Sequence, residues 1–579
     1  MKNFLKFLVL TITIISIFST NAVSLAAEPQ STQYLTDGTT NLSYSSDKVT
    51  FENGRAQLIP RGLQFEWQKT WTELGLDPAW RIATDQEGNL YTKGNIGANP
   101  NHPFVAKLNS SMERVWTYTD NPGANYVYHD YGRLFYDKHE GHIYTGGGIK
   151  DSTTGQWYWY VLALDADGNK LWSDIRIMPG IIGAANMNTD TPSYIQFGAN
   201  AFGTDSFGNL YAGGISGDTV SLINHNAHLK VIKYDSDGNT IWDKMAEKDW
   251  TFPAEIDDTT TPKRQISGGG AWDISVDGNG NVYTTGPGVL LPWPGRGEDY
   301  VTTKIDSDGD MLWARAWSNT GNKMDRSEGI SVDRNGNVYV GGFADGGGTP
   351  ITVMYDNNGN QMWVRNAFND NSDLASTSKG AILGTIIDYM GNYYGYGYNN
   401  DNSSLLVSYD SAGKRTYFAG GVTFPTGSNS GWNIAAANGY IYITTGSDSG
   451  LVPADGIVRY KYTFPNNLRS SFVIQDPNVA VEYRNLYSFA ENASGPGQIK
   501  YQVSFNGKLW YWWNGTKWAL AQNSFAEANT AEKLNNRIST FPKNVSIGKL
   551  YVRVFLDRRS YTELKSLTIG YDNIPRKKN

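Results

Sequence analysis

Residues that could transfer protons gather in two short segments of the chain. His129, Tyr131 and Arg133 occupy alternate positions of one segment, and His225 and His228 lie in a second. When a uronate-containing polysaccharide is cleaved by β-elimination, a base removes the proton next to the carboxylate, a cation neutralises that carboxylate, and an acid protonates the leaving oxygen. Histidine, arginine and tyrosine can take these roles. The five residues are therefore candidate catalytic groups of a polysaccharide lyase.

A second group of residues suits the recognition of sugar rather than its cleavage. Aromatic rings stack on the apolar C–H face of a pyranose, while amide and carboxylate groups bond its hydroxyls. The candidates for this role are Trp80, Trp159, Tyr194, Asn200, Trp272, Glu328 and Trp432. Two alternatives stay open, because such rings also pack loops against a scaffold and because several tryptophans together can close a channel.

Carboxylates leave glycoside hydrolysis open as a third kind of chemistry. That reaction needs two carboxylates about 5 to 10 Å apart, a distance that spacing along a sequence does not determine. The candidates are Asp130, Asp190, Asp218, Glu255, Asp257, Asp258, Glu298, Asp299 and Glu328. The sequence contains neither a Gly-x-Ser-x-Gly elbow nor a phosphate-binding loop, so it indicates no serine hydrolase and no nucleotide enzyme.

Indications of metal binding are weak. His225 and His228 are three residues apart, but in a loop this spacing defines no ligand geometry. The repeated Asp-x-Asp-Gly turns, which begin at Asp165, Asp235 and Asp306, are similar to the start of calcium loops but lack the closing glutamate. We therefore expect structural turns, no resident metal and no cofactor, with Ca²⁺ as the alternative.

A repeated sequence must position all of these residues. Its first half reads Asp-x-x-Gly-Asn-x-Tyr-x-x-Gly, and its second half reads apolar-x-x-apolar-Asp-x-x-Gly-x-x-x-Trp. The tyrosines of the first half are Tyr91, Tyr144, Tyr211, Tyr283, Tyr339, Tyr394 and Tyr442. Each copy holds four β-like runs joined by Asp/Gly turns, and four strands per repeat are typical of a propeller blade. The sequence thus predicts an all-β fold with a seven-bladed propeller over residues 64–464.

The last copy is incomplete, because it stops at Pro465 without its tryptophan strand. The segment Phe65–Trp71, which precedes the first copy, matches the fourth-strand pattern of Leu312–Trp317. We expect this N-terminal strand to complete the seventh blade, which removes two exposed sheet edges. The alternative is an open array of hairpins, against which the matching early strand argues.

The repeat Asp-x-x-Gly-Asn-x-Tyr-x-x-Gly resembles that of the bacterial seven-bladed β-propeller repeat family. This resemblance covers about residues 64–464 and implies a fold without a particular activity, so no functional residue is carried over. The second half of the repeat resembles the blade-docking pattern of quinone-dependent dehydrogenase propellers. Those enzymes usually have eight blades and often adjacent cysteines, whereas this chain has seven copies and no cysteine.

Turn length predicts which rim of the propeller binds a ligand. In a four-stranded meander both short repeated turns lie on one rim, here named the short-turn rim, and the longer connections lie on the opposite long-loop rim. We expect these connections within blades at about 147–160, 214–230 and 286–300, and between blades at about 117–131, 173–200, 243–271, 317–327, 366–380 and 418–431. Long loops on a rigid scaffold usually carry binding and catalysis, so the long-loop rim is the predicted working face.

Spacing also predicts a ring of residues around the central channel. The position eleven residues before each repeated tyrosine begins the innermost strand of a blade. This position holds Trp80, Asn200, Trp272, Glu328 and Leu383, while Trp432 fits after a shorter turn and blade two offers Gly132 or Arg133. These residues should surround the channel mouth, where they would suit a polar, ring-shaped ligand.

A different unit follows the repeats over residues 466–573, before a basic tail at 574–579. Strands are expected near 498–505, 508–513, 517–520, 549–556 and 562–571. Asn529 and Glu532 indicate a capping box at the start of a short helix that runs to about Ile538. The unit resembles small β-sandwich modules of secreted bacterial proteins. Part of the leader 28–63, at 44–59, should add strands to it, and a loose leader is the alternative.

The first 27 residues have the layout of a secretory signal peptide, with Lys2 and Lys6 before an apolar run from Phe7 to Phe18. That run is short for a membrane span, so we expect export to the cell exterior rather than a membrane anchor. The net charge of −7 provides no general attraction to nucleic acid or to an anionic membrane.

These observations favour an exported monomer that engages extracellular polysaccharide through the long-loop rim. Catalysis stays open at this stage: a polysaccharide lyase is the first alternative, and a glycoside hydrolase on the same face is the second. A cell-surface scaffold for protein interactions is the third.

Overall fold

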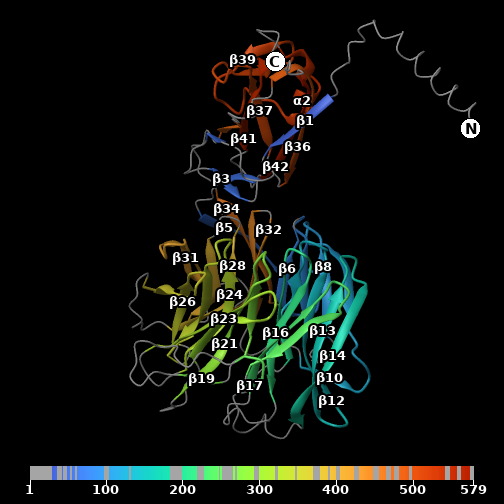
Figure 1. Ribbon diagram of the computed structural model, residues 1–579, viewed down its shortest axis with the longest axis vertical. Coiled ribbons are helices and arrows are strands. Elements are labelled where there is room, and N and C mark those ends of the chain that lie inside the picture. Colours follow the sequence, from blue (N-terminus) through green and yellow to red (C-terminus); the bar gives the residue numbers. More distant parts are fainter. Residues whose placement is uncertain are drawn as a thin grey trace, which may run out of the picture. The chain divides into compact units, whose positions relative to one another are not determined.

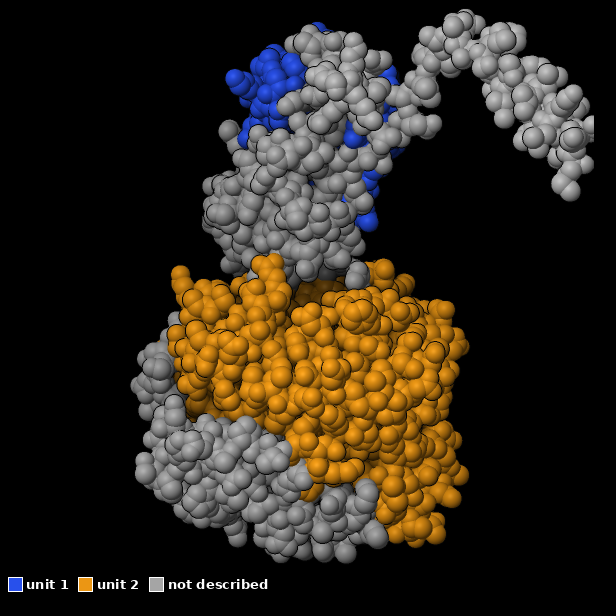
Figure 2. Space-filling model, viewed as in Figure 1, with its two compact units in different colours: residues 1–59, 466–579 blue, residues 60–465 orange. Residues whose placement is uncertain are grey.

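The computed structural model is built almost entirely of β-strands (Figure 1). It describes residues 29–34, 42–43, 49–52, 55–58, 62–85, 87–96, 103–129, 132–182, 198–217, 227–246, 248–250, 265–267, 270–291, 299–319, 324–345, 348–369, 379–388, 392–399, 404–422, 430–437, 439–446, 455–463, 471–474, 482–494, 498–541, 548–556 and 563–573. The predicted signal peptide and the basic tail lie outside these residues. The chain divides into two compact units, 60–465 and 1–59 with 466–579 (Figure 2).

Residues 60–465 form a seven-bladed β-propeller, as predicted, and each blade is one antiparallel sheet. Blade 1 is β6 (Ala79–Thr84), β7 (Leu90–Asn95), β8 (Pro103–Leu108) and β9 (Arg114–Thr119). Blade 2 is β10 (Tyr126–His129) and β11 (Phe135–Tyr136), then β12 (Ile143–Asp151), β13 (Gln156–Leu164) and β14 (Lys170–Ile182). Blade 3 is β15 (Gly198–Thr204), β16 (Leu210–Gly217), β17 (Ala227–Tyr234) and β18 (Thr240–Met245).

The remaining blades follow the same order from the inner strand to the outer strand. Blade 4 is β19 (Gln265–Ser267) and β20 (Asp273–Val276), then β21 (Val282–Leu291), β22 (Asp299–Ile305) and β23 (Met311–Trp317). Blade 5 is β24 (Arg326–Val332), β25 (Val338–Ala344), β26 (Thr349–Tyr355) and β27 (Gln361–Asn366). Blade 6 is β28 (Gly380–Ile387), β29 (Tyr393–Asn399), β30 (Ser404–Tyr409) and β31 (Arg415–Val422). Blade 7 is β32 (Ser430–Ala437), β33 (Tyr440–Gly446), β34 (Gly456–Thr463) and β5 (Gly62–Thr70).

The ring is closed by β5, which precedes every other propeller strand in the sequence and pairs antiparallel with β34 (Figure 1). Trp67 lies opposite Arg459, whose guanidinium sits 4.6 Å from the indole centroid. The Nε of Arg459 also contacts the Glu66 carboxylate at 2.6 Å. The prediction that Phe65–Trp71 completes the seventh blade is therefore confirmed.

In blades 1 to 6 the repeated aspartate organises the inner turn on the short-turn rim. Asp333 accepts hydrogen bonds from the backbone N–H groups of Asn335 and Asn337, at 2.8 and 2.9 Å, and from the Asn337 side-chain amide at 2.8 Å. The Tyr339 hydroxyl approaches the same carboxylate, and burial raises the pKa of this tyrosine, so it stays a donor. The motif is thus a turn in which one carboxylate satisfies several donors.

Blades 1 to 5 each dock on the next blade through the tryptophan of their outer strand. The Nε1 of Trp313 donates to the carbonyl of Asn357 at 3.1 Å, in the outer turn of the following blade. A Cβ added at Gly359 would lie 2.9 Å from the Trp313 ring, so glycine is needed where the ring meets that turn. The same donation runs from Trp116 to Ala166, Trp172 to Ser236, Trp242 to Ser307 and Trp363 to Ser411.

One predicted loop is wrong, because strands occupy it. The segment 147–160 forms most of a hairpin, since β12 runs to Asp151 and β13 begins at Gln156. Trp157 and Trp159 are both buried and flank a partly exposed residue, which is the alternation of a strand. Strands also extend into other predicted connections. The remaining parts of these connections that lie outside the described residues are 183–197, 218–226, 251–264, 292–298, 370–378 and 423–429.

The second unit contains two six-stranded sheets to which the leader contributes strands. One sheet holds β1 (Pro29–Tyr34), β3 (Val49–Glu52), β4 (Arg55–Leu58), β36 (Glu482–Ser494), β40 (Gly548–Lys549) and β42 (Glu563–Asn573). The other holds β2 (Leu42–Ser43), β35 (Ser471–Ile474), β37 (Ile499–Ser504), β38 (Tyr511–Trp513), β39 (Trp518–Leu520) and β41 (Tyr551–Leu556). The leader strands β1, β3 and β4 join the sheet of β42.

The short helix of this unit starts one residue later than the capping box predicts. Helix α2 (Ala531–Asn535) is capped by Thr530, whose side chain accepts from the Lys533 N–H, and η2 (Ile538–Thr540) follows. Asn529 does not cap because its Oδ1 accepts the N–H of Trp513 at 2.6 Å. Among the helices of the described residues, none is long and apolar enough to cross a membrane.

Candidate functional site

A β-bulge marks the start of the inner strand in most blades. In blades 1, 3, 5, 6 and 7 the register shifts by one residue, which leaves Trp80, Asn200, Glu328, Leu383 and Trp432 as the extra residues. In blade 4, Trp272 donates its N–H to the carbonyl of Thr285 at 2.9 Å, just before the first pair of β20. The eleven-residue spacing in the sequence therefore corresponds to a bulge at the long-loop end of the inner strands.

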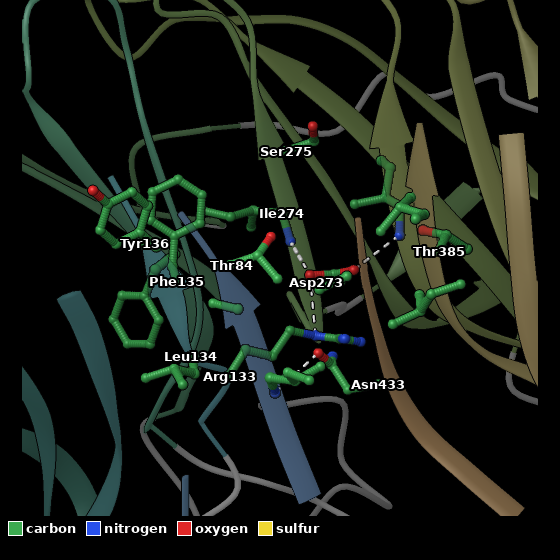
Figure 3. A pocket seen from close by; sticks show the side chains of 18 of the residues that line it. Thr84, Arg133, Leu134, Phe135, Tyr136, Asp273, Ile274, Ser275, Thr385 and Asn433 are labelled. Carbon is green, nitrogen blue, oxygen red and sulfur yellow. Dashed lines mark hydrogen bonds and ion pairs between the residues drawn. The ribbon is translucent and has the colours of Figure 1, made fainter. Parts of the chain in front are cut away.

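Arg133 links three blades across the channel. Its Nε lies 3.0 Å from the Asp273 carboxylate and donates to the carbonyl of Trp272 at 3.2 Å, both in blade 4. Its Nη2 donates to the carbonyl of Glu328 in blade 5 at 2.5 Å. Figure 3 shows the ion pair between Arg133 and Asp273. A guanidinium with several fixed donors suits this bridging position.

Glu328 and Trp272 share a second arginine. The Glu328 carboxylate lies 2.9 Å from the Nε of Arg326, and the Arg326 guanidinium lies 3.8 Å from the centre of the Trp272 ring. Burial raises the pKa of the Glu328 carboxyl, while Arg326 and Arg133 act in the opposite direction. We name Arg133, Trp272, Asp273, Arg326 and Glu328 the mouth cluster, because they meet where the channel begins.

Polar side chains also join the inner strands to one another. Asp273 accepts the N–H of Ile330 from the next blade at 3.0 Å, and Asn433 accepts the N–H of Ile82 across the closing junction at 3.3 Å. Asn200 donates to the carbonyl of Ala271 at 3.3 Å. Burial raises the pKa of Asp273, and the nearby Arg133 opposes this shift. The channel wall is therefore held together by side-chain contacts between neighbouring blades.

A cavity of about 330 Å³ occupies the channel between the Arg133–Asp273 ion pair and the short-turn ends of the inner strands. Residues from the inner strands of all seven blades line it. Its wall includes Thr84, Tyr136 and Thr204, which end inner strands just before the repeated turns, so the cavity extends toward the short-turn rim. The sequence reasoning did not identify this cavity.

The candidate lyase residues are only partly described. Arg133 belongs to the mouth cluster, and His228 lies on β17 opposite Ser216 with 5% of its surface exposed. His129 ends β10, but its side chain lies outside the described residues, as do Tyr131 and His225. Of the carboxylates considered for glycoside hydrolysis, Asp299 and Glu328 are described, and both are largely buried.

The sugar-binding candidates separate into two groups. Trp80, Asn200 and Glu328 lie at the bulges of the inner strands, as does the backbone of Trp432, and Trp272 lies just before β20. Trp272 and Asn200 are buried there. Trp159 has no exposed surface and packs in a cluster between blades 2 and 3, which is the packing alternative rather than a ligand surface. Tyr194 lies outside the described residues.

Two residues of the mouth cluster were missed by the sequence reasoning. Asp273 directly follows Trp272, and Arg326 lies two positions before Glu328. Charged residues beside the eleven-residue positions were the available signal. Within the described segments, no group of three or more His, Asp or Glu side chains is arranged to hold a metal ion.

No protein-family model and no curated protein matches the chain. Among solved structures it is similar to the β-propeller domain of the Trilobed protease from Pyrococcus furiosus, with 10% identity, a TM-score of 0.37 and coverage of 68% of this chain and 100% of that one. It is similar to polysaccharide lyase Uly1, with 10% identity, a TM-score of 0.35 and coverage of 72% and 99%. A mutant of puromycin hydrolase gives 10% identity and a TM-score of 0.36, covering 67% of this chain, which spans 53% of that hydrolase.

Proposed function

We propose that the protein is exported and binds extracellular polysaccharide on the long-loop rim of its propeller, without cleaving it. The observation that carries this proposal is the mouth cluster together with the bulge residue Trp80. The Trp272 ring, which is 5% exposed, lies 3.8 Å from the Arg326 guanidinium, and this guanidinium also contacts the Glu328 carboxylate. Trp80, at the bulge of blade 1, is partly exposed. Tryptophan with planar polar groups is the combination that binds the apolar face and the hydroxyls of a sugar.

Rigid positioning supports a binding role for this rim. The bulge residues emerge from strands whose neighbours are fixed by the contacts of Asp273 with Ile330 and of Asn433 with Ile82. A ligand that meets such groups does not have to order them first, so less affinity is lost on binding. The inner strands of different blades thus present a prearranged set of side chains around one axis.

The contacts of Arg133 favour binding over elimination. A lyase needs a cation that faces the substrate carboxylate, but Arg133 directs its Nε to Asp273 and Trp272 and its Nη2 to Glu328. These interactions use the guanidinium to hold the channel wall. Two of the three guanidinium nitrogens of Arg133 therefore hold the channel wall, and among the described residues a single nitrogen, Nη1, is left rather than the paired donors that clamp a substrate carboxylate.

The proposal is tested by comparing two single aromatic deletions. Trp80→Ala removes a ring at the long-loop end of an inner strand, whereas Phe207→Ala removes a ring that is 80% exposed in a turn of the short-turn rim. Affinity for a panel of neutral and uronate-containing polysaccharides is measured by titration calorimetry. We expect Trp80→Ala to weaken binding by about tenfold or more, which corresponds to about 1.4 kcal/mol, and Phe207→Ala to leave it unchanged.

Product formation is followed on the same samples through the ultraviolet absorbance of unsaturated sugars and through new reducing ends. We expect binding without either product. Release of unsaturated products would establish the lyase alternative, and release of reducing ends alone would establish the hydrolase. Equal loss of binding in the two variants would place the site elsewhere.

A further inference from the structure

The channel cavity has a polar end, and its walls combine isoleucine side chains with hydroxyl side chains. At one end lie Arg133, Asp273 and Asn433 (Figure 3). The walls carry isoleucine side chains from several inner strands. We propose that this cavity binds a small organic carboxylate, with its carboxylate at Arg133 and Asn433 and its apolar part along the walls. This site shares Arg133 and Asp273 with the mouth cluster, but the rest of its lining, from Ile82 to Ala436, lies on the short-turn side of these two residues and is not part of the proposed polysaccharide site.

The hydrogen-bonding groups at the polar end of the cavity favour an anionic ligand. The Oδ1 of Asp273 contacts Arg133 and accepts the Ile274 N–H, while its Oδ2 accepts the Ile330 N–H. The Oδ1 of Asn433 accepts the Ile82 N–H, which orients the amide and leaves its NH₂ group to donate.

Arg133 has donor capacity left in the same place. Its Nε and Nη2 contact protein oxygens, and within the described part of the chain its Nη1 has no acceptor. A guanidinium nitrogen and an amide nitrogen are donors only, so the groups still to be satisfied call for an acceptor. A carboxylate supplies two acceptor oxygens with a negative charge.

The isoleucines on the walls favour an apolar face on the rest of the ligand. Ile82, Ile274, Ile330, Ile386 and Ile434 all line the cavity. Two of the wall hydroxyls are already engaged, because Thr84 donates to the carbonyl of Ala436 and Thr385 shares a hydrogen bond with Ser331, while Ser275 and Tyr136 add further hydroxyls to the lining. A ligand with many hydroxyls would leave them without partners along the isoleucines, whereas a hydrocarbon body gains by burial.

Size and access restrict the ligand further. A cavity of about 330 Å³ lies at the lower end of the range for small-molecule sites, about 300 to 1,000 Å³. This volume accommodates a benzoate-sized acid. Because the wall reaches Thr84, Tyr136 and Thr204, such a ligand would enter from the short-turn rim.

Titration calorimetry with benzoate tests the proposal on the full chain, and benzyl alcohol serves as the neutral control. We expect benzoate to bind and benzyl alcohol to bind at least about tenfold more weakly, which is about 1.4 kcal/mol. Asn433→Asp keeps the acceptor for the Ile82 N–H but replaces the donating NH₂ by a carboxylate oxygen. This variant should lose benzoate binding by about tenfold or more while its thermal unfolding stays cooperative.

A second variant protects the test against misfolding. Ser275→Trp places a large side chain in the cavity from β20 and should abolish benzoate binding without changing the affinity for polysaccharide. The proposal is overturned if the unaltered protein does not bind benzoate, if benzyl alcohol binds equally well, or if Ser275→Trp binds benzoate normally. Loss of polysaccharide binding alone would count against the proposed function and leave this site standing.

Discussion

The two rims of the propeller use the same strands in opposite ways. On the short-turn rim, turns such as that of Asp333 repeat one arrangement of a carboxylate, a positive-φ glycine and a tyrosine from blade to blade. At the long-loop end, the equivalent bulge position holds a tryptophan, an asparagine, a glutamate or a leucine. Repetition on the short-turn rim indicates a structural role that recurs from blade to blade. Variation at the long-loop end indicates a binding role to which each blade contributes a different side chain.

The carboxylates of the two rims also differ in their electrostatics. On the short-turn rim, hydrogen bonds from Asn239 lower the pKa of Asp235. In the mouth cluster, burial raises the pKa of Asp273 and of Glu328. A carboxylate whose pKa falls on folding stabilises the folded state when it is charged. A carboxylate whose pKa rises on folding destabilises the folded state when it is charged. The molecule therefore tolerates an energetic cost at the mouth cluster, as functional sites commonly do.

The largest effect is expected where blades dock. Trp313→Ala removes a largely buried indole, its hydrogen bond to Asn357 and its contact with Gly359, and should lower the free energy of unfolding by about 3 to 5 kcal/mol. Leu312→Ala, at the neighbouring and 53% exposed position, should change it by about 0.5 kcal/mol or less. Chemical denaturation compares the two. Equal effects would mean that the indole is not what joins blades 4 and 5.

A smaller effect is expected for one repeated turn. Asp333→Ala leaves the N–H groups of Asn335 and Asn337 without their acceptor and should cost about 1 to 3 kcal/mol. Asn335→Ala in the same turn keeps those backbone bonds and should cost less. The midpoints of urea unfolding measure the difference. A larger loss for Asn335→Ala would contradict the role given to the aspartate.

The smallest effect concerns the pH dependence of stability, with opposite signs for the two rims. The lowered pKa of Asp235 means that its contribution is present above the unfolded pKa and is lost as pH falls through the folded value. The raised pKa of Glu328 means that its contribution is present below the unfolded pKa and is lost as pH rises through the folded value.

Two charge-neutralising variants separate these contributions. Relative to the unaltered protein, Asp235→Asn should become less stable as pH rises from about 2 to about 4, and Glu328→Gln should become more stable as pH rises from about 4 to about 7. Unfolding free energies at these three pH values measure the two slopes. If the stability differences of both variants changed in the same direction with pH, the two carboxylates would not differ in the sign of their pKa shifts, which would contradict the contrast between the rims.

Local pattern was sufficient to predict the scaffold. The closing strand Phe65–Trp71 was predicted from the unfinished last copy and from its match to Leu312–Trp317, although its partner β34 lies far along the chain. The repeated tyrosines and the Asp/Gly turns predicted the blades, because each hairpin joins residues close together in the sequence. The eleven-residue spacing led to the bulges for the same reason. Strand alternation through Trp157 and Trp159 was the local signal that was misread, and these residues extend a hairpin instead of a loop.

Contacts across the channel could not be predicted in this way. Arg133 meets Asp273 and Glu328 only after closure brings blades 2, 4 and 5 around one axis. The distance between such residues along the chain carries no information about their geometry, and the cavity exists only when all inner strands are in place. The site therefore depends on the closed ring rather than on any one repeat.

Hydrogen exchange with and without bound polysaccharide tests most directly the claim that the rims divide binding from scaffolding. Protection should rise in the backbone around Trp80, Trp272 and Glu328, and stay unchanged in the turns that begin at Asp205 and Asp333. Protection confined to those turns, or to the unit that contains β42, would contradict the account.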